Sequence, residues 1–335
     1  MREFLEKILN MQSLSVDESE QLLNRIMDGE GDQVQIGAIL AGLRAKGESV
    51  EEILGFVRAL RSKSRTVRTL PRPLMDTCGT GGDGSRSFNI STLVAFVLAG
   101  AGVPVAKHGN RAVSGQTGSA DLVEALGIRV EWKEEEVEEG LCTTSFAFLF
   151  APYYHPAMKV VAPIRKALGV KTVFNLLGPM TNPCIPEYQL IGVYSLARAQ
   201  MMAEVLSHDK RKKVFLIHSD LGWDEAVPAV PCHLFRVEGD RVKKDYLQPE
   251  ELGFAGCRPE DLQGGTSKEN AAAALRVLRG ENGALREAVV LNAGLAFLAC
   301  EKVGSLHEGF ELAREILDSG KAHSLVETLR EKFPQ

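Results

Sequence analysis

Apolar residues in the first sixty positions recur every three or four residues. They form groups at residues 22–26, 36–43 and 53–60. This spacing is typical of amphipathic helices whose apolar stripe faces a shared core. We therefore predict a small helical domain over residues 1–65.

The ends of these helices are also marked in the sequence. Ser15 and Ser49 each precede a glutamate by three positions, which is the pattern of a capping box at the start of a helix. Gly29 and Gly47 stand where left-handed helix ends are expected. The pattern predicts several short helices instead of one long helix.

A basic stretch with two prolines at residues 62–73 has the composition of a linker. After it, apolar runs alternate with amphipathic segments, which predicts an α/β domain over residues 66–335 with a mostly parallel sheet covered by helices. Ligands of such sheets bind at the carboxyl ends of the strands. The predicted strands span residues 74–77, 103–106, 147–150, 190–193, 214–218 and 234–237. The predicted helices span residues 91–101, 120–126, 162–168, 196–206, 268–278 and 285–300.

Composition and charge exclude several classes of function. The 335 residues are 44% hydrophobic and 25% charged, as in an ordinary globular protein. The net charge of -5 provides no basic field for nucleic acid, and the longest apolar stretch, residues 93–102, is shorter than the ~18 residues of a membrane span. Six scattered cysteines without a C-x-x-C pair are interpreted as reduced core thiols. We expect a cytoplasmic protein that binds neither nucleic acid nor membrane.

A glycine loop at residues 76–92 lies between a predicted strand and a predicted helix, with the sequence DTCGTGGDGSRSFNIST. Glycines let the backbone approach an anion closely, and the N–H groups of a helix that Asn89 or Ser91 would cap point at that anion. The loop therefore predicts a phosphate site.

Three of these glycines also satisfy the G-x-G-x-x-G pattern of dinucleotide-binding enzymes. Two features count against that alternative. Residues 85–89 separate the glycines from the helix, and the next predicted strand leads into Lys107 instead of an acid that would hold a ribose. Asp83 inside the loop would repel a pyrophosphate, so a sugar hydroxyl or a metal-bound water is its expected partner.

A second polar loop at residues 107–121 also follows a strand and precedes a helix. Lys107 can meet a phosphate as a point charge, and Ser119 can offer a hydroxyl and a backbone N–H at a helix start. His108 and Arg111, each taken alone, are expected to make structural hydrogen bonds. The group as a whole, facing the first loop, favours anion binding.

Asp224 and Glu225 follow the predicted strand at residues 214–218. Adjacent carboxylates usually belong to a solvated turn. Beside two phosphate loops they could instead hold Mg²⁺, which takes few protein carboxylates and keeps phosphate and water ligands. Spacing alone leaves both interpretations open.

The chain resembles the anthranilate phosphoribosyltransferases over essentially its whole length, from the N-terminal helices to Gly264-Gly265-Thr266 and beyond. The motifs that carry the resemblance are Gly79-Thr80-Gly81-Gly82-Asp83, Asn89-Ile90-Ser91-Thr92, Lys107-His108-Gly109-Asn110-Arg111, Phe150-Ala151-Pro152-x-Tyr154-His155-Pro156-Ala157-Met158-Lys159, Phe174-Asn175-Leu176-Leu177-Gly178-Pro179 and Asp224-Glu225.

The resemblance implies a fold of the nucleoside phosphorylase and phosphoribosyltransferase type. It implies a helical domain, completed by helices near residues 165–185, that is hinged to the α/β domain and mediates homodimerisation. It also implies transfer of the phosphoribosyl group of phosphoribosyl pyrophosphate (PRPP) to anthranilate in tryptophan biosynthesis, with two Mg²⁺ ions.

The resemblance further assigns residues to each ligand. The residues implied for PRPP are Gly79, Gly82, Asp83, Ser87, Asn89, Ile90, Ser91, Thr92, Lys107 and Ser119. Those implied for Mg²⁺ are Ser91, Asp224 and Glu225, and those for anthranilate are Gly79, Asn110 and Arg165. Lys107, Asp224, Glu225 and Arg165 are the implied catalytic residues. Without the resemblance, Arg165 would be interpreted as a solvated helix residue.

The amino nitrogen of anthranilate is a poor nucleophile, so this reaction depends on the departure of pyrophosphate. We expect Mg²⁺, Lys107 and the loop N–H groups to neutralise the leaving group, while Arg165 and Asn110 align the amine. His108 is a less favoured proton carrier.

The chain departs from the family pattern in two places. Gln116 stands where many members carry lysine, and Ala226-Val227-Pro228 follows the acidic pair. Two alternatives remain beside the transferase. A related pyrimidine nucleoside phosphorylase would bind free phosphate and have no reason to keep the acidic pair, and a non-catalytic nucleic-acid-binding relative would show a basic stripe.

Overall fold

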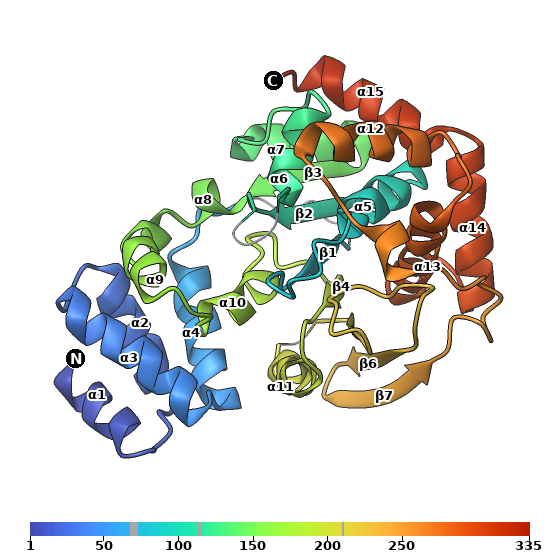
Figure 1. The fold of residues 1–335 in the computed structure, drawn as a ribbon. Helices are drawn as coiled ribbons and strands as arrows, with labels where there is room; N and C mark the ends of the chain where they lie inside the picture. The colour runs from blue at the N-terminus through green and yellow to red at the C-terminus, as the bar shows by residue number, and fades with distance from the viewer. Residues whose placement is uncertain (68–72, 113–115, 210) are drawn as a thin grey trace.

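The computed structural model describes residues 1–67, 73–112, 116–209 and 211–335, and it has two lobes (Figure 1). Four helices form most of the smaller lobe, and the predicted capping boxes at Ser15 and Ser49 are both present. Gly29 and Gly47 both have positive φ, as predicted, but Gly47 has a ψ of 124° and is therefore not in the left-handed helical conformation. The four helices are α1 (Arg2–Leu9), α2 (Val16–Met27), α3 (Gln33–Lys46) and α4 (Val50–Ser62).

The larger lobe is built on a seven-stranded sheet with the order β3-β2-β1-β4-β5-β6-β7. The first five strands of that order (β3, β2, β1, β4 and β5) are parallel to one another, and β6 and β7 are antiparallel to their neighbours. This confirms the predicted α/β fold with a mostly parallel sheet. The strands are β1 (Met75–Gly79), β2 (Val105–Gly109), β3 (Phe146–Phe150), β4 (Tyr188–Gly192), β5 (Lys213–Ser219), β6 (Cys232–Glu238) and β7 (Arg241–Leu247).

Helices cover both faces of this sheet (Figure 1). All six helices predicted after residue 66 are present, with ends within one residue of the prediction. The longer helices are α5 (Ile90–Gly100), α6 (Ser119–Ala125), α7 (Glu134–Thr144), α9 (Ala162–Leu168), α11 (Leu196–Ser207), α12 (Ser267–Leu278), α13 (Ala284–Ala299), α14 (Leu306–Asp318) and α15 (Lys321–Lys332). The short ones are α8 (Ala151–Tyr154), α10 (Phe174–Leu177), η1 (Pro156–Lys159), η2 (Gly178–Met180) and η3 (Pro259–Leu262).

The sheet separates two apolar cores, because successive side chains of a strand point to opposite faces. On β5, Phe215 and Ile217 join the core that contains helices α5 and α13. Val214 and Leu216 join the core that contains α11 and the N-terminal helices. Ile164 of α9 belongs to this second core. The smaller lobe is therefore built from the N-terminal helices together with later helices of the chain.

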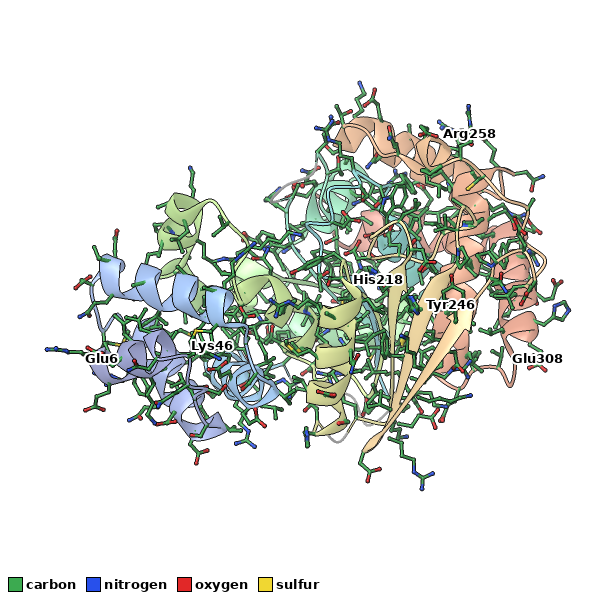
Figure 2. All side chains as sticks on the ribbon, turned by 60° about the horizontal axis from the view of Figure 1, so that its bottom comes forward. Glu6, Lys46, His218, Tyr246, Arg258 and Glu308 are labelled. Atoms are coloured by element: carbon green, nitrogen blue, oxygen red, sulfur yellow. The ribbon has the colours of Figure 1, made fainter. Side chains whose placement is uncertain are left out.

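Polar contacts also tie the two lobes together. Arg61 of α4 donates from Nη1 to Asp209 Oδ1 at 2.7 Å and from Nε to the Met180 carbonyl oxygen at 3.0 Å. Glu48 pairs with Arg198 of α11 at 2.7 Å. Figure 2 shows Lys46 on the helical lobe, well separated from His218 and Tyr246 at the antiparallel end of the sheet.

The predicted cysteine environment is only partly right. All six thiols are free, and Cys184 and Cys232 are buried, but Cys142 is exposed on α7.

Among the described residues, none of the helices has both the length and the apolar character needed to cross a membrane.

The strand order reverses beside β1. The chain passes from β1 to β2 and β3 on one side, then to β4 and β5 on the other. The carboxyl ends of β1 and β4 consequently flank a crevice, which is where open α/β sheets bind their ligands. The glycine loop follows β1 at this point.

Candidate active site

The glycine loop bends sharply as it leaves β1. Gly81 and Gly82 have φ of +64° and +69°, a left-handed conformation that costs glycine least. The N–H of Thr80 donates to the Gly192 carbonyl oxygen at 2.9 Å. Gly79 has no room for a side chain, because an added Cβ would overlap Asp224 Oδ2. The loop is thus fastened to β4 and to the acidic pair.

The acidic pair is packed against the glycine loop. Asp224 is buried and accepts a hydrogen bond from the Gly81 N–H at 2.7 Å. Its own N–H donates to Asp83 Oδ2 at 3.4 Å. Glu225 Oε2 is buried and lacks a hydrogen-bond partner in the described structure. The solvated-turn interpretation of this pair is wrong.

The electrostatics of the three acids suit a cation. Burial, and then the charge of Asp83, raise the pKa of Asp224 to about 7. Burial, Asp224 and Asp83 raise the pKa of Glu225 well above its usual range, while the Ser87 hydroxyl and the Ser91 N–H oppose that rise. Buried carboxylates repel one another unless a proton or a positive charge lies between them.

A small cavity with room for about one water molecule borders this cluster. Its lining includes Ser91, Asp224 and Glu225, the residues predicted to hold the metal. In the part of the chain that the structure describes, no group of three or more acidic, histidine or cysteine side chains is arranged as a complete metal site. The hydroxyl of Ser91 and the carboxylates of Asp224 and Glu225 are oxygen donors, which fit Mg²⁺ because this ion takes few protein carboxylates and keeps water and phosphate ligands.

Lys107 lies beneath the loop and is almost fully buried. Its Nζ donates to the Thr77 carbonyl oxygen at 2.6 Å and is 3.5 Å from Ser91 Oγ. Burial lowers its pKa, and the charges of Asp76 and Glu225 raise it. In the described structure the ammonium is held by the protein at the floor of the site.

Asp76, a fully buried acid on β1, was not among the predicted site residues. It accepts hydrogen bonds from the His108 N–H at 3.2 Å, from Asn182 Nδ2 at 2.9 Å and from Gln189 Nε2 at 3.1 Å. Burial raises its pKa, and the charge of Lys107 opposes the rise. Asp76 positions the end of β2, where Lys107 and His108 lie.

The start of helix α5 differs from the prediction in one respect. Asn89 occupies the N-cap position, but its side chain makes no cap. Its Nδ2 donates to the Thr117 carbonyl oxygen and its Oδ1 accepts from Asn270, both at 2.9 Å. The side chain therefore links the start of α5 to the second loop and to helix α12. Ser91 lies in the first turn instead of capping it.

Three other predicted PRPP residues of this loop are placed as follows. Ile90 is fully buried in the apolar core, so only its backbone could reach a ligand. The Thr92 hydroxyl is buried without a partner in the described structure. The Ser87 N–H donates to Ser85 Oγ at 3.0 Å, and its backbone pairs with Gln263.

The second loop is stabilised by its own side chains. Ser119 Oγ accepts from the Asn110 N–H at 3.1 Å and donates to the Asn110 carbonyl oxygen at 3.2 Å. Arg111 forms ion pairs with Asp121 and Glu124, which confirms the structural interpretation of Arg111. Residues 113–115 lie outside the described part of the chain. Gln116 is exposed.

Two buried histidines lie near the end of β2. The ring centroids of His108 and His155 are 5.2 Å apart, and the Nε2 atom of each has no hydrogen-bond partner in the described structure. Burial lowers the pKa of His108 to about 4 and that of His155 to about 3. Both rings are therefore neutral at pH 7.

Arg165 lies on α9 in the helical lobe. Its guanidinium carbon is 5.3 Å from the centroid of the Phe174 ring. Burial lowers its pKa, and none of the acids in the described part of the chain opposes this effect. The residue is half-buried, so the solvated-helix interpretation made from spacing alone is wrong. An arginine without an acid beside it is suited to a carboxylate ligand.

Comparisons with known proteins agree with this architecture. The α/β domain of a glycosyl transferase family matches residues 71–323, and the helical bundle domain of such a family matches residues 2–64. The anthranilate phosphoribosyltransferase of Pelotomaculum thermopropionicum is 47% identical over 327 residues, which cover 98% of this chain and 94% of that protein. The anthranilate phosphoribosyltransferase of Desulforudis audaxviator is 45% identical over 331 residues, covering 99% and 96%.

Solved structures show the same likeness. The anthranilate phosphoribosyltransferase of Thermus thermophilus superposes with a TM-score of 0.91 at 44% identity, covering 98% of both chains. The enzyme of Saccharomyces cerevisiae in complex with PRPP and Mg superposes with a TM-score of 0.91 at 26% identity, covering 99% of this chain and 97% of that chain. The chain described here belongs to the anthranilate phosphoribosyltransferases, glycosyltransferases of tryptophan biosynthesis that transfer the phosphoribosyl group of PRPP to anthranilate.

Proposed function

We propose that this chain carries out the transfer at the crevice between β1 and β4, with Mg²⁺ held by Ser91, Asp224 and Glu225. The observation that carries this proposal is the buried acidic cluster behind the glycine loop, whose carboxylates raise one another's pKa and which has Lys107 at its floor. Bound Mg²⁺ would supply charge neutralisation to pyrophosphate as it leaves. We propose two ions per subunit.

The glycine loop binds the phosphates of PRPP in this proposal. The backbone of Gly79 and Gly82, with the first turn of α5, presents N–H groups to the pyrophosphate. Asp83 contacts a sugar hydroxyl or a metal-bound water, because its charge excludes direct contact with phosphate. Lys107, held at the floor of the site by the Thr77 carbonyl, adds positive charge close to the leaving group.

Around that loop we propose a wider PRPP shell of Ser87, Asn89, Ile90, Thr92 and Ser119. Asn89 and Ser119 act partly through the loops that they link. Ile90 contributes only its backbone, since its side chain is buried. These residues fix the ribose orientation and exclude water, which favours a single direction of attack.

Anthranilate binds beside Arg165 and Asn110 in this proposal, close to the backbone of Gly79. The planar guanidinium of Arg165 can hold a carboxylate with two parallel hydrogen bonds. The Asn110 backbone is fixed by Ser119, and its side-chain oxygen accepts from the Arg111 N–H at 2.8 Å. The buried rings of His108 and His155 are neutral at pH 7, and the proposed reaction requires no histidine general base.

The reaction itself is tested by the fluorescence of anthranilate. We expect the emission to fall when PRPP and Mg²⁺ are added together with the enzyme, and to stay constant when either is left out. Constant emission with all components and a folded enzyme would contradict the proposed function. Phosphate-dependent cleavage of a pyrimidine nucleoside would favour the phosphorylase alternative instead.

We also propose a cytoplasmic homodimer. Free thiols are typical of a reducing compartment. Val34, in the first turn of α3, and Val170, two residues after α9, are 81% and 51% exposed, and these two helices pack on each other through Gly37. Light scattering should give the mass of a dimer, and Val34→Asp with Val170→Asp should give a monomer. The matched control is Val242→Asp on β7, which should remain dimeric.

A further inference from the structure

Lys171 lies between helices α9 and α10, in a segment that belongs to the helical lobe. Its carbonyl oxygen accepts a hydrogen bond from Arg44 of α3, so its backbone is fastened to that lobe. Its side chain extends toward the other lobe, where Nζ lies 3.7 Å from the centroid of the Tyr194 ring. Lys171 thus crosses from one lobe to the other.

The side chain of Lys171 also lies against the glycine loop. A Cβ built on Gly82 would be 3.4 Å from Lys171 Cε and 3.9 Å from Lys171 Nζ. Tyr194, on which the ammonium stacks, donates its N–H to Thr80 Oγ1 at 3.3 Å. The ammonium therefore lies next to the first half of the loop, where Gly81 and Gly82 take their left-handed conformation.

The ammonium lacks an anionic partner in the described part of the chain. Its side chain makes a cation–π contact with Tyr194, and the residue is only partly exposed. Lys107 differs, because its ammonium is already bonded to Thr77 at the floor of the site. A partly desolvated cation beside a glycine loop is complementary to an anion bound on that loop.

We propose that Lys171 binds a phosphate group of PRPP at the Gly81–Gly82 side of the glycine loop, so that the helical lobe contributes directly to the phosphate site. This inference rests on the proposed function. A lysine presents a compact point charge, which suits a phosphate more than a planar carboxylate. Arg165 stacks on Phe174 instead, so the two cations serve different ligands.

The test replaces Lys171 by Met, which keeps the aliphatic stem over Tyr194 and removes the charge. We expect the KM for PRPP to rise about tenfold, as for the loss of one charged hydrogen bond, with less than a twofold change in the KM for anthranilate. Lys171→Arg should restore most of the affinity. The matched control is Lys166→Met, an exposed lysine five residues earlier, which should behave as wild type.

A second measurement does not depend on turnover. Calorimetric titration with inorganic pyrophosphate and Mg²⁺ should give weaker binding to Lys171→Met, with a shallower dependence on salt. Thermal melting identifies a misfolded variant, in which case Lys171→Gln replaces it. Unchanged pyrophosphate binding and an unchanged KM for PRPP would overturn the inference, as would a change confined to anthranilate. A wild-type enzyme that binds pyrophosphate without consuming anthranilate would contradict the proposed function and leave the Lys171 inference standing.

Discussion

Asp224 Oδ2 accepts a 2.7 Å hydrogen bond from the backbone N–H of Gly81. This bond joins the segment that follows β5 to the loop that follows β1, so the conformation of the glycine loop and the position of the acidic cluster depend on each other. A group that binds at either place therefore affects the other.

Gly79→Ala tests this dependence. The added Cβ would overlap Asp224 Oδ2, and the same carboxylate would have to move. We expect kcat/KM to fall about 100-fold, since a displacement of about 1 Å in a catalytic site has that effect. The matched control is Gly256→Ala, where nothing lies within 4 Å of an added Cβ. Equal kinetics for both variants would contradict the close coupling.

The acidic pair should matter more for turnover than for folding. Asp224→Asn combined with Glu225→Gln removes two buried, mutually repelling carboxylates, so we expect the melting temperature to stay constant or rise. We expect turnover to fall by at least about 100-fold, because Mg²⁺ loses its protein ligands. Steady-state kinetics and a thermal melt measure both quantities. Wild-type turnover in the double variant would show that the pair does not hold the metal.

Arg165 separates recognition of anthranilate from recognition of PRPP. Arg165→Ala should raise the KM for anthranilate by a loss of about 2–4 kcal/mol, as for a truncated charge-assisted pair, and leave the KM for PRPP nearly constant. Arg165→Lys should fall between the two enzymes, because an ammonium cannot form the bidentate contact. If both constants changed together and the melt stayed unaltered, Arg165 would have to be a phosphate-binding or structural residue.

The two buried histidines predict a specific loss of stability in acid. Burial lowers the pKa of His108 to about 4 and of His155 to about 3, whereas an unfolded histidine titrates near 6.5. The unfolded chain therefore binds more protons below pH 6.5, and folding stability falls as the pH decreases from about 6.5 to about 3. The full loss is about 3 kcal/mol for His108 and about 5 kcal/mol for His155.

His155→Gln should flatten this pH dependence. Urea unfolding at several pH values measures the free energy of unfolding of both proteins, and the difference between them should depend on pH below 6.5. A constant difference from pH 7 to pH 4 would show that His155 is not held neutral by the fold.

Periodicity and glycine spacing predicted most of the fold. Strands β3, β4 and β5 were recognised because both of their faces are largely buried and each contains an apolar run. Strand β7 was missed because its residues are mainly charged and exposed, so no apolar alternation marks it. Helix α7 was missed for a similar reason, since it begins with three consecutive glutamates.

The site was predicted less completely than the fold. The glycine loop and the acidic pair have local signatures, and the family resemblance contributed Arg165. Asp76 and Lys171 have none, because their roles come from residues far away in sequence. Asp76 bonds to Asn182 and Gln189, which are 106 and 113 residues away, and Lys171 meets Gly82 only through the approach of the two lobes. Such contacts become visible only when the chain is folded.

The central claim is that this site transfers the phosphoribosyl group with the help of Mg²⁺ held by oxygen ligands. The most direct measurement is the rate of pyrophosphate release from PRPP and anthranilate by enzyme that was stripped with a chelator and then titrated with Mg²⁺. We predict no release in the stripped enzyme and a return to full rate as Mg²⁺ is added, with no such return in the Asp224→Asn, Glu225→Gln variant. An undiminished rate after thorough chelation would contradict the claim.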